Sequence, residues 1–267
     1  KIKEAKEIVD SALETYPRNL LLNQYKIDLN ENRNVQAFNC KKEEHIISEI
    51  LYITSNALSA QSIYPLSNFY LNLAKYLNED FHSYDTLLAE NFYKTNNFDT
   101  AKKIYNNLSK KGEAFNWYSS KQIARIFLKK DSKSEAIKLL EKSYRSLSKK
   151  EVYEIFDYAE FLKNNEKFEE AIPLYSKVIN LVQQDHPLYT ESTDGRGIAY
   201  ERTGEWDKAE KDFLASLKAN PDQAYVINYL AYSWIEQGIK IKKSLSMLEK
   251  ANKLRSNDPY ITDSLGW

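Results

Sequence analysis

The chain has 267 residues, and its 38 lysine and arginine residues balance 38 aspartate and glutamate residues, so its formal net charge is zero. Nucleic-acid-binding proteins usually carry an excess of basic residues, which this chain lacks, so no nucleic acid is expected as a partner. The single cysteine, Cys40, excludes an intramolecular disulfide, and three scattered histidines are too few for a metal cluster. No run of the sequence approaches the roughly 18 consecutive apolar residues of a membrane-spanning helix.

The first 47 residues predict degenerate N-terminal helices. Residues 1–16 carry apolar side chains at helical spacing and end before Pro17, and residues 20–29 form a second helical stretch. Polar residues 30–34 interrupt this pattern, and residues 20–47 show no register with the later repeats. Because the sequence starts inside a helical pattern, we expect it to be a fragment of a longer protein.

From residue 48 onward one pattern recurs, in units starting near 48, 82, 117, 152, 190 and 224, with a truncated unit at 259. Each unit has a small residue at its eighth position, and each complete unit has another at its twentieth, where two antiparallel helices would touch. The eighth positions hold Ser55, Ala89, Ala124, Ala159, Gly197, Ala231 and Gly266. The twentieth hold Ser67, Ala101, Ala136, Ala171, Ala209 and Ser244, where the unit starting at 224 needs one extra residue near 238–242. We therefore predict a single solenoid over residues 1–267.

The unit at residues 190–223 shows how one helix pair would pack. Gly197 and Ala209 form the small pair, Tyr200 and Phe213 are the large residues beside them, and Gly204 lies in the turn. Equivalent large residues recur as Leu58, Phe92, Phe127, Leu162 and Trp234 on first helices, and as Leu71, Tyr105, Leu140, Tyr175 and Leu248 on second helices. This arrangement predicts an all-α fold of stacked helix pairs.

These recurring positions resemble the tetratricopeptide repeat (TPR) family over about residues 48–267. The segments LYTESTDGRGIAYERTGEWDKAEKDFL, YVINYLAYSWIEQG and NDPYITDSLGW are similar to a group of bacterial multi-repeat TPR proteins that are often exported or lipid-anchored. The resemblance implies an α-solenoid of helix-turn-helix units in a right-handed superhelix. It also implies a protein-binding scaffold, in the cell envelope or periplasm, with the cytoplasm as the alternative.

No pattern in the sequence predicts catalysis or cofactor binding. Gly195, Gly197 and Gly204 do not form G-x-G-x-x-G, and no serine lies in G-x-S-x-G. His45 and Glu49 could share a helix face, but no third metal ligand accompanies them. We therefore expect no catalytic residues, no cofactor and no metal, and we expect that the chain is not an enzyme.

Aromatic and polar residues on the last three first helices predict a face for a protein or peptide partner. Position five pairs with position nine one turn later, which places Asp194 with Ile198, Asn228 with Tyr232, and Asp263 with Trp267. Tyr225 and Tyr229 complete the predicted face. Such groups suit an extended peptide or a partner helix in a concave groove, although the rings could instead fill gaps between repeats.

Two classes of function agree with this sequence. The first is a non-enzymatic adaptor, and the alternative is the scaffold portion of a larger enzyme whose catalytic domain lies outside this fragment. Self-association through the truncated C-terminal unit is a further expectation. Basic residues dominate 129–150 and acidic residues dominate 151–172, which forms either a bipolar docking surface or a solvated face.

Arg196 lies where most units carry an apolar residue, so it should be partly buried and paired. Its candidate partners are Glu201, Glu210 and Asp212, or an acid of the preceding unit.

Overall fold

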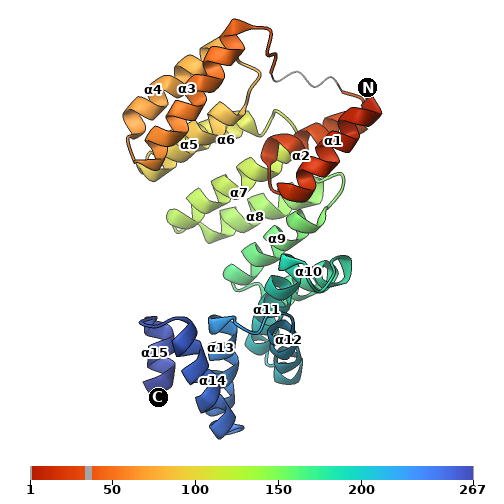
Figure 1. The fold of residues 1–267 in the computed structure, drawn as a ribbon, viewed down its shortest axis with the longest axis vertical. Helices are drawn as coiled ribbons and strands as arrows, with labels where there is room; N and C mark the ends of the chain where they lie inside the picture. The colour runs from red at the N-terminus through yellow and green to blue at the C-terminus, as the bar shows by residue number, and fades with distance from the viewer. Residues whose placement is uncertain (1, 34–37, 267) are drawn as a thin grey trace. The chain divides into compact units, whose positions relative to one another are not determined.

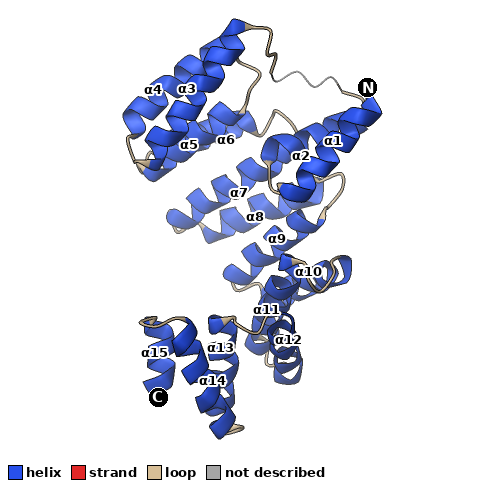
Figure 2. Ribbon diagram, in the orientation of Figure 1, coloured by secondary structure: helices blue, strands red, loops and turns tan. Residues whose placement is uncertain are grey.

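The protein is described here by a computed structural model, which describes residues 2–33 and 38–266. In these residues every regular element is an α-helix, which confirms the all-α prediction (Figures 1 and 2). The chain divides into two compact units, Lys1–Lys149 and Lys150–Trp267. The expectation of one continuous solenoid, and of its right-handed winding, stays a prediction.

Apart from residues 31–42, the connections between successive helices are short. The first compact unit contains α1 (Ile2–Thr15), α2 (Leu20–Asn30), α3 (Glu43–Ala60), α4 (Tyr64–Leu77), α5 (Ser83–Lys94), α6 (Phe98–Leu108), α7 (Glu113–Lys129) and α8 (Lys133–Ser146). The second contains α9 (Val152–Asn164), α10 (Phe168–Leu181), α11 (Pro187–Arg202), α12 (Trp206–Ala219), α13 (Ala224–Glu236), α14 (Ile241–Leu254) and α15 (Pro259–Gly266).

The turn inside each complete helix pair has the same backbone conformation. The residue at the fifteenth position of the unit has a positive φ, as in Ser62, Asn96, Asp131, Glu166, Gly204 and Gly238. The next N–H donates to the carbonyl of the large residue at position eleven, for example Glu205 to Tyr200 at 2.7 Å and Ile239 to Trp234 at 2.9 Å. This is the Schellman ending of a helix, which satisfies carbonyls that the helix leaves unpaired.

The predicted small positions lie at the contacts between paired helices. Twelve of the thirteen are buried, and Gly266 on α15 is exposed. A Cβ on Gly197 would lie 2.7 Å from the Phe213 ring, so the small residue is needed for the ring to fit. The large residues on second helices, including Phe213, are at most 1% exposed: Leu71, Tyr105, Leu140, Tyr175, Phe213 and Leu248.

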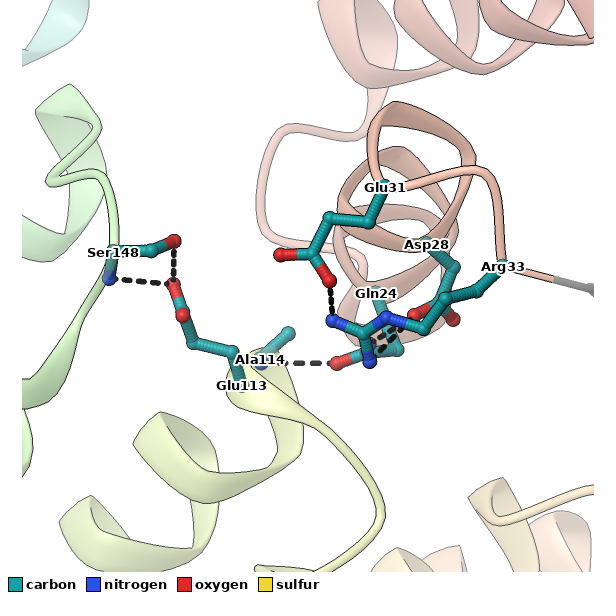
Figure 3. Close-up of polar contacts among 7 residues, drawn as sticks. All are labelled: Gln24, Asp28, Glu31, Arg33, Glu113, Ala114 and Ser148. Atoms are coloured by element: carbon teal, nitrogen blue, oxygen red, sulfur yellow. Dashed lines mark hydrogen bonds and ion pairs between the residues drawn. The ribbon is translucent and has the colours of Figure 1, made fainter.

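The N-terminal helices do not continue the stack in chain order. Helix α2 contacts α7, and Leu20 and Leu21 pack on a core cluster that includes Phe115 of α7. Gln24 is 3% exposed, and its Oε1 accepts a hydrogen bond from the Ala114 N–H at 3.0 Å (Figure 3). The repeat pattern showed no register for this segment because its packing partner lies some 90 residues away.

Polar contacts anchor both sides of this junction. The Gln24 amide donates to Asp28 Oδ1 at 2.8 Å, and Arg33 pairs with Asp28 and with Glu31 (Figure 3). At the start of α7, Glu113 accepts hydrogen bonds from the amide and the hydroxyl of Ser148, at 3.1 and 2.9 Å. The side chain of Gln24 leaves no room at Gly112, where a Cβ would lie 2.2 Å from Gln24 Oε1.

Candidate protein-binding face

Two predicted residues present buried acceptor atoms without partners. Asp194 and Asn228 hold the same position on the consecutive first helices α11 and α13, and both are partly buried. The Oδ1 atom of each is buried and has no hydrogen-bond partner among the described residues. Asp263, at the same position of α15, is exposed. Since an unsatisfied buried oxygen costs free energy, such pairs in a native fold call for an explanation.

The environment of Asp194 disfavours its charge. Burial raises the pKa of this carboxyl to about 7, while the Ser216 hydroxyl and the Lys163 ammonium lower it only in part. The acids Glu191 and Asp212 raise the pKa further. Near neutral pH the carboxyl therefore lies close to the midpoint of its titration.

Asp194→Asn should stabilise the chain at pH 8 and change its stability little at pH 4. A folded-state pKa above the unfolded value means that the folded state binds the proton more tightly, so stability falls as the pH rises from about 4 to about 7. We expect a gain of about 2 kcal/mol at pH 8, measured by urea unfolding at both pH values. Asp263→Asn is the control, because Asp263 holds the same position on α15 but is exposed. Equal effects of both substitutions on stability would contradict the raised pKa of Asp194.

The apolar partners of these residues lie in different surroundings. Ile198 packs against the core cluster of Ala209, Phe213, Leu230 and Trp234. Tyr232 is partly buried, and a hydrogen bond to Glu236 raises the pKa of its hydroxyl. Trp267 lies outside the described residues. On α11 and α13 the polar and the apolar residue of each pair lie one turn apart, and their role in binding stays a prediction.

Tyr229 contacts the preceding unit, and Tyr225 contacts the end of its own unit. The Tyr229 hydroxyl donates to Glu201 at 2.8 Å, and its ring lies 5.3 Å from that of Phe213. The Tyr225 hydroxyl donates to Asp258 at 2.7 Å and accepts from Arg255 at 3.0 Å. The contacts of Tyr229 agree with the alternative in which some rings fill the space between repeats.

Arg196 is partly buried and paired, as its position predicted. Its Nε and Nη2 donate to the two carboxylate oxygens of Asp212, each at 2.7 Å, and Nη1 donates to Ser176 at 2.9 Å. The side chains of Arg196 and Asp212 are 20% and 10% exposed. The sequence could not choose among Glu201, Glu210, Asp212 and the acids of the preceding unit. In the structure the partner is Asp212, whose carboxylate meets the guanidinium edge in a bidentate pair.

Comparison with known proteins agrees with the repeat architecture. No family model matches the chain. A curated relative, TPR repeat-containing protein PA4667 of Pseudomonas aeruginosa, is 30% identical over 110 residues, which are 41% of this chain and 18% of that protein. This part of the chain is similar to a tetratricopeptide-repeat protein. The matched part is thus a small share of that TPR protein's length.

Solved TPR structures share the fold. A chain of the APC/C hetero-tetramer Cut9–Hcn1 matches all of this chain and 52% of its own length, with a TM-score of 0.55 and 15% identity. The C-terminal part of a TPR repeat-containing protein from Cytophaga hutchinsonii matches 76% of this chain and 78% of its own length, with a TM-score of 0.52 and 16% identity. At these identities the likeness concerns the fold alone.

The TPR fold also forms a pocket that the sequence patterns missed. This pocket, of about 730 Å³, lies on the first compact unit and is lined by side chains of α4, α5, α6 and their connections. Three lysines, Lys75, Lys110 and Lys111, face it together with Glu79 and Asp85, and Lys75 pairs with Asp85 at 2.5 Å. Its residues come from two adjacent repeats, so no spacing within one repeat signals it.

The described residues contain neither a membrane-spanning helix nor a cluster of metal ligands. No helix among them is long and apolar enough to cross a membrane. Within residues 2–33 and 38–266, no group of three or more His, Cys, Asp and Glu side chains could hold a metal ion.

Proposed function

We propose that this TPR chain is a non-enzymatic protein-interaction scaffold and that the first helices α11, α13 and α15 bind an extended peptide or a helix of a partner protein. The observation that carries the proposal is the pair of buried, unpartnered oxygens on Asp194 and Asn228. Both atoms accept hydrogen bonds, and the N–H groups of a partner backbone are donors. A bound peptide whose N–H groups displace the side chains covering these oxygens would therefore satisfy atoms that the free chain leaves unpaired.

The surroundings of these oxygens suit a protein ligand. Each lies one helical turn from an apolar side chain, Ile198 or Tyr232, so polar and apolar groups alternate along the face. Peptide recognition combines backbone hydrogen bonds with pockets for side chains. A fold relative, in the Cut9–Hcn1 hetero-tetramer, assembles with another protein, which agrees with a scaffold.

Asn228→Ala combined with Tyr232→Ala should weaken partner binding by about 2 kcal/mol or more, as expected for central anchors. The partner is first captured by pull-down from the native cell, and its affinity is then measured by calorimetry. Both side chains are partly buried but lie outside the fully buried core, so helicity by circular dichroism should stay unchanged.

The comparison variant reverses the charge of Lys138, Lys142 and Arg145 on α8. We expect this variant to bind the partner as the unmodified chain does. Binding that survives the change at Asn228 and Tyr232 but falls with the reversed charges would assign the site to the basic surface and overturn the proposal.

A further inference from the structure

An exposed apolar stripe runs along α4. We use the name α4 stripe for Ile63, which precedes the helix, and Leu66, Phe69, Leu73 and Tyr76, which recur at helical spacing on it. Phe69 is 62% exposed and Tyr76 is 80% exposed. The only charged residue of Tyr64–Leu77 is Lys75, and its ammonium is already paired with Asp85.

The α4 stripe differs from the same positions of every other second helix. In the unit numbering these are positions 16, 19, 22, 26 and 29. When the unit at 224 is counted with one extra residue, Ile239, the five other complete units fill them with polar or charged residues, apart from Pro173 and Ala215. At position 22, where α4 has Phe69, three units carry Lys103, Lys138 and Lys211; at position 29, where α4 has Tyr76, three carry Lys110, Lys218 and Lys253. The apolar side chains are therefore a property of this unit and not of the repeat.

The neighbouring helix α3 also exposes apolar side chains on one face. Ile50 and Ile53, at unit positions three and six, are 58% and 62% exposed, and Ile46 precedes them on the same side. In α11 these positions hold Ser192 and Gly195, which are buried. Gly195 there faces Tyr175 of the preceding helix α10, where a Cβ would lie 2.5 Å from the ring. Helix α3 thus presents to solvent the face that α11 buries against a preceding helix.

We infer that the α4 stripe, together with Ile46, Ile50 and Ile53, is a self-association surface on which a second copy of this chain packs. The eight side chains expose roughly 600 Å² of apolar surface, taking on the order of 100 Å² for an aliphatic and 200 Å² for an aromatic side chain. A standard interface buries about 800 Å² on each partner, a little over half of it apolar. One copy therefore offers enough apolar area for a stable dimer.

The chemistry of this surface favours a second copy of the same chain as the partner that packs on it. A twofold dimer brings the same patch of each chain together, so the patch must be complementary to itself. The eight apolar side chains meet this condition. Lys75, the charged residue of α4, is paired, and the exposed acids of α3, Glu43 and Glu44, lie in its first turn, before Ile46, Ile50 and Ile53. The chain also has a formal net charge of zero, so two copies do not repel each other overall.

The test measures the dissociation constant of the dimer by sedimentation equilibrium over a range of micromolar concentrations. Phe69→Lys combined with Tyr76→Lys installs residues that other units carry at the same positions, so the helix should still form. We expect the unmodified chain to be a dimer and the double variant to dissociate at least about 100-fold more readily, because each change occurs twice in the interface.

Leu245→Lys is the matched control, because Leu245 on α14 is 51% exposed and lies outside the surface. It should leave the dimer intact. A photo-crosslinking phenylalanine analogue at Phe69 gives a second readout and should yield a product of twice the chain mass. A monomeric unmodified chain, a dimer that Phe69→Lys with Tyr76→Lys leaves intact, or a crosslink only to a different protein would overturn the inference.

Discussion

Asp212→Ala is expected to lower the free energy of unfolding by about 3 kcal/mol, because it leaves the partly buried Arg196 guanidinium without its counter-charge. The lost pair is bidentate, with both N–O distances at 2.7 Å. The remaining hydrogen bond, from Arg196 to the Ser176 hydroxyl, offers no negative charge. Urea unfolding followed by circular dichroism measures the effect.

Two further variants distinguish the effect of losing the ion pair from the effect of losing side-chain packing. Asp222→Ala removes an exposed acid that pairs with Lys250 at 2.9 Å, and it should change stability by less than about 0.5 kcal/mol. Arg196→Leu with Asp212→Leu replaces both charges, and it should recover most of the loss, since apolar groups can replace a buried ion pair. If Asp212→Ala cost no more than Asp222→Ala, the pair would not stabilise the fold.

Gly195→Val is expected to destabilise the chain by about 3 kcal/mol, at the upper end of the usual cost of overpacking. A Cβ at this position would lie 2.5 Å from the Tyr175 ring. That ring is fully buried, and its hydroxyl donates to Glu160, which also accepts from Lys163 at 2.7 and 2.9 Å. The ring therefore has no free direction in which to move.

Gly266→Val provides the control for a valine in place of a helical glycine. A Cβ at Gly266 meets nothing within 4 Å, so the change should stay within about 0.5 kcal/mol. Both variants are compared by thermal and urea unfolding. Equal effects at Gly195 and Gly266 would show that the contact between α10 and α11 adapts to the added volume.

The sequence by itself determined the helix pairs and their internal contacts. Gly197 opposite Phe213, and the turn at Gly204, could be predicted because both members of each contact lie within one repeat, where spacing along the chain sets distance in space. The burial and pairing of Arg196 could be predicted because a guanidinium at an apolar position must find an acceptor. These are local rules, and they recur in every unit.

Only the tertiary structure decided which partner a group takes where several groups could pair with it. Glu201 accepts from Tyr229, and Glu210 accepts from Trp234 at 2.7 Å, both from the next unit, whereas Asp212 pairs with Arg196 inside its own unit. The same competition decided that Tyr229 packs on Phe213 while Asn228 keeps an unpartnered oxygen.

The N-terminal segment shows the same limit over a longer distance. Helix α2 lies on α7 because Gln24 and Leu20 find their partners there, at Ala114 and in the cluster around Phe115. A periodic pattern sets which face of a helix is buried, but it carries no record of which distant helix covers that face. That choice depends on the shapes and hydrogen-bonding groups of both surfaces, which exist only once the chain has folded.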